Sequence, residues 1–212
     1  MNPKDNHNTC FRMPGINAGM LTLKELERIT DLVRRYDVPM VKITGTQGLY
    51  FQGLAPEKHA EMMHELELPA SLVHTDNHAR SVQACPGKNL CKYGTRETEH
   101  MARAIAEMEL DGPLPCKVKV GISGCRMCCC ESWMRDVGLS AEKKGWRFTF
   151  GGNAAGRPRI GDLVADGLSD EEALNLVKKT LNYYLATAKI KTRSARFMER
   201  IGIEELKKAV LG

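Results

Sequence analysis

The amino-acid sequence predicts an α+β fold in two parts, a small first part and a larger second part that carries most of the cysteines. Three observations support this prediction. Helical and strand-like segments follow one another between residues 22 and 68 in the order helix, strand, strand, helix. Six of the eight cysteines stand in two clusters, at residues 85–91 and 125–130. The chain then ends in helical segments, which begin at residue 169.

The first part opens with a helix predicted over residues 22–36, where apolar residues recur at helical spacing behind a threonine that can cap the helix. Residues 38–44 and 48–54 are strand-like runs with a glycine-containing turn between them. Residues 56–68 begin with a proline, which is common at the first position of a helix, and they predict a second helix. This order suits helices packed on one small antiparallel sheet.

The second part begins with the polar, turn-rich residues 69–90, which end in the first cysteine cluster. Helical spacing returns over residues 97–110, and Asp111-Gly112-Pro113 stops it. Residues 116–122 alternate between polar and apolar side chains, as a strand does, and they run directly into the second cluster.

The remaining residues predict a hairpin, a loop and two helices. Residues 136–152 predict a hairpin that turns at Lys144-Gly145, and a glycine-rich loop follows over residues 151–162. A serine and an acidic first turn predict a helix over residues 169–191. Residues 203–211 predict a short final helix.

The composition indicates a globular protein with a mild basic excess. The chain has 212 residues, which is enough to bury a sizeable core, and a formal net charge of +5. No run of Lys and Arg interleaved with aromatic residues occurs, so we expect no nucleic-acid partner. A mild positive balance suits a polyanionic cofactor, a small anionic substrate or an acidic protein partner.

We expect a cytoplasmic protein with no membrane partner. No apolar run is long enough to span a membrane, and the first residues lack the basic and then apolar pattern of a secretory signal. Because thiols stay reduced in the cytoplasm, clustered cysteines there favour a metal site or catalysis over disulfides.

The cysteine spacings favour an iron–sulfur cluster and leave zinc open. Cys85 and Cys91 form a C-x5-C pair, which fits zinc poorly because structural zinc sites use cysteines two to four residues apart. Cys125 and Cys129 form a C-x3-C pair, and four thiolates from two loops suit a cubane cluster. Cys125 and Cys128 also make a C-x2-C pair, so spacing alone does not exclude a zinc-stabilised binding module.

The segments around these cysteines resemble the sirohaem and [4Fe–4S] nitrite/sulfite reductase family. The resemblance rests on CPGKNLC, LPCKVKVGISGCRMCC, DVGL and GGNAAGRPRIGD, in that order. It implies that Cys85, Cys91, Cys125 and Cys129 bind one [4Fe–4S] cluster. It also implies that Cys129 bridges the cluster to the iron of a sirohaem.

Residues 11–54 resemble the ferredoxin-like half-domain of the same family. We therefore expect a ferredoxin-like half-domain over residues 1–68 and an α/β domain that binds sirohaem and the [4Fe–4S] cluster over residues 69–212. Many family members carry two such units in tandem and build the active site across their pseudo-two-fold axis. A single unit therefore implies a homodimer.

The resemblance also implies basic residues for the substrate and for the carboxylates of sirohaem. Arg80, Lys117 and Lys119 are the predicted catalytic residues, because cations must hold an oxyanion and deliver protons to it. The alternative for the two lysines is a solvated strand face. The residues predicted to bind sirohaem, besides Cys129, are Arg12, Lys42, Arg157 and Arg159.

The sequence departs from the family pattern at two places. Thr46 stands where the family often has a substrate-binding arginine. The run CRMCCC adds Cys128 and Cys130 around the last ligand, as spare thiols or as competitors for the bridge.

The function implied is an assimilatory-type sulfite reductase, which reduces sulfite to sulfide with six electrons that pass through the cluster to sirohaem. The alternatives are a nitrite reductase of the same family and a non-catalytic iron–sulfur/sirohaem redox protein, which Thr46 favours. No G-x-G-x-x-G motif follows a strand, so we expect a separate low-potential electron donor such as ferredoxin.

Overall fold

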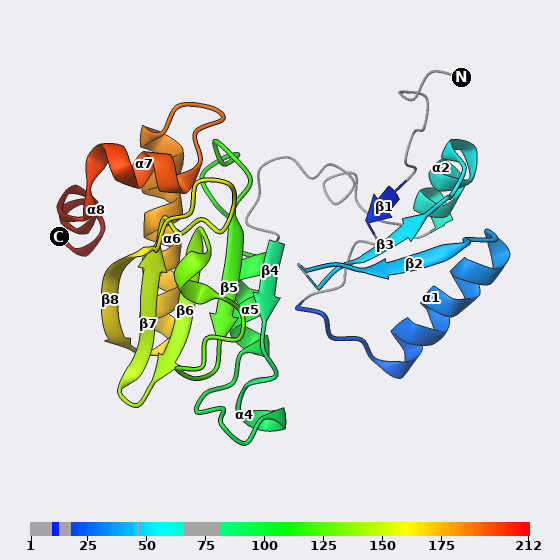
Figure 1. Cartoon of the computed structure of the whole chain (residues 1–212), viewed down its shortest axis with the longest axis horizontal. Helices are drawn as coiled ribbons and strands as arrows, with labels where there is room; N and C mark the ends of the chain where they lie inside the picture. Colours follow the sequence, from blue (N-terminus) through cyan, green and yellow to red (C-terminus); the bar gives the residue numbers. More distant parts are fainter. Residues whose placement is uncertain (1–9, 13–17, 46, 66–80) are drawn as a thin grey trace. The chain divides into compact units, whose positions relative to one another are not determined.

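The computed structural model describes residues 10–12, 18–45, 47–65 and 81–212. It divides the chain into two compact units, Met1–Thr75 and Asp76–Gly212, which we call unit 1 and unit 2. Figure 1 shows that each unit has its own sheet and helices. The predicted boundary between residues 68 and 69 lies outside the described residues and stays a prediction.

Unit 1 is a small antiparallel sheet with two helices. The strands β1 (Cys10–Arg12), β2 (Met40–Ile43) and β3 (Leu49–Gln52) lie in the order β1-β3-β2. The helices are α1 (Leu23–Arg35) and α2 (Pro56–Glu65). Their apolar side chains and those of the sheet share one core, made of Ile29, Leu32, Val38, Phe51, Leu54 and Met62.

A local signal fixes the start of α1. The Thr22 side chain accepts a hydrogen bond from the Glu25 N–H, and the Glu25 carboxylate accepts one from the Thr22 N–H. This capping box satisfies two backbone donors that the first turn of a helix leaves without partners.

Unit 2 is built on a five-stranded mixed sheet. The strands are β4 (Ser81–Ala84), β5 (Lys119–Ser123), β6 (Val137–Glu142), β7 (Gly145–Phe150) and β8 (Asp162–Leu168), and they lie in chain order. β4, β5 and β6 run parallel, whereas β7 and β8 pair antiparallel. Parallel neighbours place their carboxyl ends at the same edge of a sheet. The segments after β4 and β5 therefore emerge side by side.

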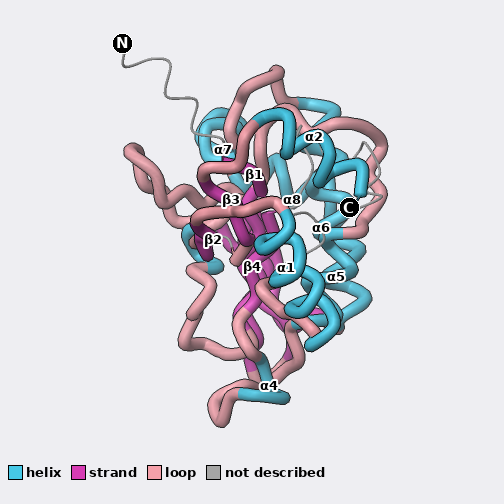
Figure 2. Tube along the Cα trace, turned by 90° about the vertical axis from the view of Figure 1, so that its right-hand side faces the viewer, coloured by secondary structure: helices cyan, strands magenta, loops and turns pink. Residues whose placement is uncertain are grey.

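Helices cover one face of this sheet. Figure 2 shows α5 (Glu99–Ala106) and α6 (Asp170–Thr187) on the same side of the unit 2 strands, and the two helices contact each other. The chain ends with α7 (Ser194–Ile201) and α8 (Ile203–Leu211). Ser169 and Glu172 form a second capping box at the start of α6.

Aromatic side chains fill the core of unit 2. Trp146, Phe148 and Phe150 of β7 are fully buried, as are Tyr184 of α6 and Phe197 of α7. The Tyr184 ring lies edge-on to the rings of Phe150 and Phe197, with centroid separations of 5.8 and 5.2 Å. Such aromatic pairs contribute about 1 kcal/mol each beyond the burial of their area. None of the four predicted cluster ligands belongs to this core.

Several elements differ from the sequence-based predictions. β4 and the short helix α4 (Gly87–Leu90) lie in a segment predicted as turns, and β1, β8 and α7 were not predicted. The hairpin turns at Lys143-Lys144, because Gly145 already pairs with Glu142. The predicted strand over 116–122 begins only at Lys119 and extends to Ser123.

Among the described residues, no helix combines the length and the apolar composition that crossing a membrane requires.

Candidate metal centre

The two cysteine clusters meet at the carboxyl edge of the β4–β5 pair. Ala84 pairs with Ile122 in the parallel register, and the next residue, Cys85, donates its N–H to the Ile122 carbonyl at 3.0 Å. Cys125 follows the end of β5 by two residues. The sheet therefore brings together two clusters that are more than thirty residues apart in the sequence.

Glycines allow the two loops to touch. The Gly124 N–H donates a hydrogen bond to the Cys85 Sγ atom at 3.1 Å. A Cβ atom at Gly124 would lie only 2.9 Å from the Cα atom of Gly87. The N–H and the hydroxyl of Thr95 both donate to the Gly124 carbonyl, at 2.7 and 3.0 Å. Each loop thus contributes to the shape of the other.

The first loop turns tightly between its two cysteines. Gly87 has a φ of +62°, in the left-handed region that favours glycine, and its carbonyl accepts the Cys91 N–H at 3.0 Å. The Thr98 hydroxyl donates to the Cys85 carbonyl at 2.5 Å and ties the loop to the start of α5. This turn fixes the backbone between Cys85 and Cys91.

The second loop separates one buried cysteine from its neighbours. Cys128 has a φ of +55°, which is unusual for a residue with a side chain and marks a sharp change of chain direction. The Cys130 side chain is buried, and its N–H donates to the Ser123 hydroxyl at 3.2 Å. Burial, followed by nearby Cys85, raises the pKa of the Cys130 thiol to about 12. Cys130 therefore packs as a core residue.

An arginine and a serine hold the base of the second loop. The Arg135 Nε–H donates to the Cys130 carbonyl at 3.3 Å, and its Nη2 group donates to Gln83 Oε1 of β4 at 2.6 Å. The Ser132 hydroxyl donates to the Leu139 carbonyl at 2.9 Å and lies 2.9 Å from the Ser123 hydroxyl. This network anchors the loop to strands on both sides.

The pKa of Cys129 reflects the other predicted ligands. The Cys129 side chain is exposed, and its pKa is raised first by desolvation and then by the neighbouring thiols of Cys85, Cys125, Cys91 and Cys128. Thiols that influence one another in this way repel as thiolates unless a cation lies among them. Metal binding supplies that positive charge and deprotonates the thiols.

This donor set fits an iron–sulfur cluster. A cubane takes one thiolate at each iron, so its ligands stand apart around it, and amide donors to the sulfurs tune its potential. The Gly124 N–H already points at Cys85 Sγ. In the part of the chain that the structure describes, no three His, Cys, Asp or Glu side chains are grouped closely enough to hold a single metal ion.

The predicted substrate lysines lie at the other end of β5. Lys119 is the first residue of the strand, and its N–H donates to Asp136 Oδ2 at 2.8 Å. Lys117 is exposed and precedes the strand. The whole of β5 thus separates these lysines from Cys125 of the same chain.

The arginines of the glycine-rich loop already have partners. The Arg159 guanidinium donates to the Gly151 carbonyl at 3.0 Å and pairs with Asp162 at 2.6 Å. The exposed Arg157 side chain lies 3.3 Å from the Glu199 carboxylate.

The other basic residues predicted to bind sirohaem belong to unit 1. Lys42 is an exposed residue of β2, and the backbone of Arg12 belongs to β1. Arg80 and Thr46 lie outside the described residues.

Sequence reasoning missed the residues that position the loops. Gly124, Ser123 and Arg135 act through contacts between distant segments, and only the glycine directly before Cys125 signals a close approach in the sequence.

Buried Asp136 accepts hydrogen bonds from Arg193 at 2.8 Å and from the Ser194 hydroxyl, which links the start of β6 to α7. Burial raises the pKa of Asp136, although Arg193, Ser194 and Lys119 oppose the rise.

Two family models match the chain. The model of the nitrite and sulphite reductase 4Fe-4S domain matches residues 75–212, and the model of the nitrite/sulfite reductase ferredoxin-like half domain matches residues 3–68. Together they match nearly all of the sequence.

Individual proteins are similar as well. The chain is 40% identical over 200 residues to an assimilatory-type sulfite reductase of Nitratidesulfovibrio vulgaris, covering 94% of this chain and 91% of that protein. It is 32% identical to a nitrite reductase [NAD(P)H] of Bacillus subtilis, covering 92% of this chain but only 24% of that protein. The solved structure of the Mycobacterium tuberculosis NirA protein superposes with a TM-score of 0.75 at 19% identity, over 95% of this chain and 40% of NirA, which shows a shared fold.

Proposed function

The chain belongs to the nitrite and sulphite reductase family, and we propose that it is a sirohaem-dependent sulfite reductase of the assimilatory type. The predicted fold class, a ferredoxin-like half-domain followed by an α/β cofactor-binding domain, is confirmed. The observation that supports the function most is the similarity in length and sequence to the Nitratidesulfovibrio vulgaris sulfite reductase. The nitrite reductases that match are much longer and less similar.

An iron–sulfur cluster follows from the matched 4Fe-4S domain. We assign its ligands to Cys85, Cys91, Cys125 and Cys129, since these thiols come from two loops that Gly124 and Gly87 hold in contact. Cys130 is not assigned as a ligand, because its side chain is buried. Cys128 remains a spare thiol in this assignment.

Sirohaem is the second cofactor in the proposal. Exposed Cys129 is the ligand free to bridge toward it, and Arg12, Lys42 and Arg157 remain candidates to pair with its carboxylates. Arg159 is also a candidate, although its guanidinium already holds the glycine-rich loop together. When bound, the two cofactors would relay to sulfite the six electrons that an external donor supplies for its reduction to sulfide.

The chain's own contribution is positive charge placed for an oxyanion. Lys117 and Lys119, with Arg80, are the groups proposed to hold sulfite and to donate protons as its oxygens leave as water. Because β5 separates the two lysines from Cys125 of the same chain, the proposed active site combines the lysines of one protomer with Cys129 of its partner. This arrangement makes the homodimer part of the function.

The first experiment is an absorption spectrum of protein purified without oxygen from cells that make sirohaem. We expect a Soret band and a red-region chlorin band, together with sulfide formation when reduced methyl viologen and sulfite are added. A colourless zinc protein obtained under the same conditions would refute the proposal. A cluster spectrum alone, without turnover after reconstitution with sirohaem, would favour the non-catalytic redox protein.

Nitrite is the alternative substrate, since the family includes reductases of both anions. Viologen-linked turnover of sulfite and nitrite on the same preparation separates the two functions. We expect a higher kcat/KM for sulfite. A higher value for nitrite would reverse the assignment.

Mixed dimers test the shared site. Chains with Cys129→Ser lack the bridge, and chains with Lys117→Ala and Lys119→Ala lack the cations. We expect each homodimer to be inactive and the mixture to regain part of the activity, because one of its two sites combines intact groups. Failure of the mixed dimer to regain activity would contradict sharing of the site between protomers.

The proposed electron donor is a low-potential ferredoxin, and the proposed location of the protein is the cytoplasm.

A further inference from the structure

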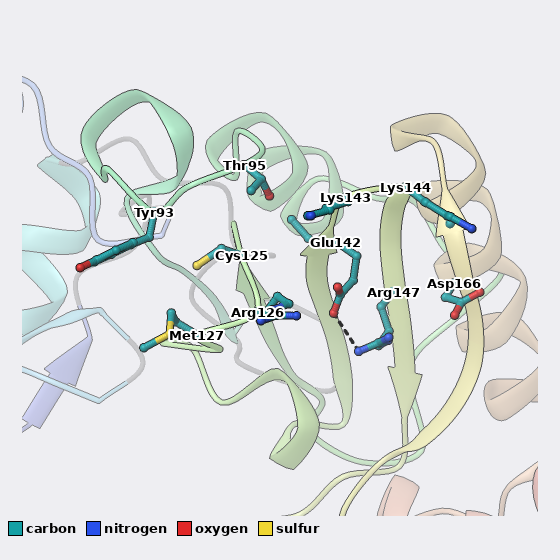
Figure 3. Close-up of a pocket in the computed structure, with 12 residues that line it drawn as sticks. Tyr93, Thr95, Cys125, Arg126, Met127, Glu142, Lys143, Lys144, Arg147 and Asp166 are labelled. Carbon is teal, nitrogen blue, oxygen red and sulfur yellow. Dashed lines mark hydrogen bonds and ion pairs between the residues drawn. The ribbon is translucent and has the colours of Figure 1, made fainter.

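A hollow in unit 2 adjoins the cluster ligands. It has a volume of about 720 Å³, and four segments form its walls: the two cysteine loops, the β6–β7 hairpin and part of β8. Figure 3 shows Tyr93, Cys125 and Met127 on one wall and Arg147 and Asp166 on the other. Among the four proposed ligands, Cys125 alone lines the hollow within the described residues.

The charge of this hollow is positive. Arg126, Lys143 and Lys144 are exposed in its lining and form no ion pair with any residue that the structure describes. Arg147 is neutralised by Glu142 at 2.8 Å, so Asp166 remains as the opposing carboxylate. A concave basic surface focuses its field outward and attracts an acidic partner.

Exposed apolar side chains stand beside the cations. Tyr93 is 60% exposed and Met127 is 70% exposed, and both line the hollow. Leu90, on the same cysteine loop as Tyr93, is 76% exposed. Tyrosine, methionine and arginine are enriched in the contact regions of protein interfaces. Large exposed apolar side chains in a basic rim therefore favour a protein partner over a small anion.

We propose that this basic hollow is the docking surface for an acidic iron–sulfur electron-carrier protein, which reduces the cluster through its Cys125 side. The inference rests on the proposed function. Cys125 would hold the cluster on the side of the donor, whereas Cys129, which does not line the hollow, would remain for the sirohaem. Redox complexes bind weakly and use small interfaces. A second copy of this chain fits poorly, because its net charge of +5 is also positive.

Charge reversal on the hairpin tests the proposal. We would measure sulfite reduction by the dimeric, cofactor-loaded enzyme with a reduced acidic [4Fe–4S] ferredoxin at low ionic strength. For the variant Lys143→Glu/Lys144→Glu, we expect kcat/KM for ferredoxin to fall about tenfold or more, with a weaker dependence on salt. Methyl viologen, a small donor that needs no docking surface, serves as the second electron source. Its turnover is expected to stay unchanged.

A matched control reverses the same charge elsewhere. Lys207 and Lys208 are adjacent lysines of α8, which Figure 1 shows beyond the edge strand β8 and away from the β6–β7 turn. Lys207→Glu/Lys208→Glu changes the net charge equally and is expected to leave the ferredoxin reaction unchanged. Carbodiimide cross-linking to ferredoxin, read by mass spectrometry, is expected to join its carboxylates to Lys143 or Lys144.

The outcomes separate this inference from the proposed function. No viologen-linked turnover of sulfite by the unmodified enzyme would refute the proposed function itself. Normal viologen turnover with an unchanged ferredoxin reaction in the hairpin variant would overturn the docking surface alone. An equal fall in the α8 control, or equal losses with both donors in the hairpin variant, would overturn it as well.

Discussion

The N–H of Gly124 donates a hydrogen bond to the Sγ atom of Cys85 across 3.1 Å, and this bond joins two loops that lie far apart in the sequence. The same glycine has no room for a side chain, since Gly87 packs against it. One residue therefore supplies both a donor to the sulfur of a proposed ligand and the close approach of the two loops. The geometry of the four thiols depends on residues that never bind iron.

We expect Gly124→Ala to lose most of its cluster. The added Cβ would lie 2.8 Å from the Arg96 carbonyl oxygen and 2.9 Å from the Gly87 Cα atom, so the backbone of one loop must move. Overpacking of this kind costs about 2 kcal/mol, which for a chain of this size lowers the thermal midpoint by roughly 4 to 8 °C. Iron content and the melting curve measure both effects. The control is Gly156→Ala, where the added Cβ meets nothing within 4 Å.

Serine substitutions are expected to divide the cysteines into two groups. Replacing Cys85, Cys91, Cys125 or Cys129 removes a proposed ligand, and we expect iron and acid-labile sulfide to fall sharply in each case. Cys128→Ser keeps the four ligands and is expected to keep the cluster. If Cys128→Ser loses as much iron as Cys129→Ser, the ligand assignment in the second loop is wrong.

We expect Arg193→Met to destabilise the protein more at pH 7 than at pH 5. Buried Asp136 would lose the guanidinium that lies 2.8 Å from it, and its already raised pKa would rise further. Because the folded chain then holds a proton that the unfolded chain releases, its stability falls as pH rises above the ordinary carboxyl pKa. Arg193 is one-third exposed, so solvent screens part of its attraction to Asp136. The expected loss of folding free energy is therefore about 2 kcal/mol, or roughly 4 to 8 °C in the thermal midpoint.

The control for this prediction is Arg103→Met, which breaks the ion pair with Glu99 on the surface of α5. Exposed pairs contribute little, so its midpoint is expected to change by about 2 °C or less at either pH. Equal losses for Arg193→Met at pH 5 and pH 7 would show that Asp136 does not titrate with the proposed sign.

Removal of the cluster is expected to leave the fold of unit 2 in place. The aromatic core around Trp146 and Tyr184 contains none of the four proposed ligand side chains. After treatment with a chelator and an oxidant, we expect the far-ultraviolet circular dichroism to persist and the thermal midpoint to fall. Rebuilding with iron and sulfide is expected to restore the midpoint. Loss of the dichroism on iron removal would show that folding requires the metal.

Elements with local signals were predictable from the sequence. Thr22 with Glu25 and Ser169 with Glu172 encode the starts of α1 and α6 in four residues each, and both helices begin where predicted. β8 was missed because its side chains alternate poorly, and Asp166-Gly167 within it looks like a turn. β4 is a strand because it pairs with β5, and no pattern within the residues of β4 itself indicates that pairing.

The candidate site was predictable in its chemistry but not in its packing. Cysteine spacing and the resemblance predicted an iron–sulfur cluster, which the matched 4Fe-4S domain confirms. The ligand set remains a prediction that substitution tests. The contact of Gly124 with Gly87 and the support of Cys130 by Ser123 depend on the parallel pairing of two strands, which local sequence does not reveal.

The parallel pairing of β4 and β5 joins two cysteine loops that are made at different times during the protein's synthesis. Cys91 leaves the ribosome 34 residues before Cys125, and at about 5 to 20 residues per second the first pair waits for roughly two to seven seconds. During that interval two reduced thiols are available to whatever metal the cell offers. Their C-x5-C spacing makes a poor zinc ligand. A lone C-x5-C pair is therefore a poor site for zinc before the second loop exists.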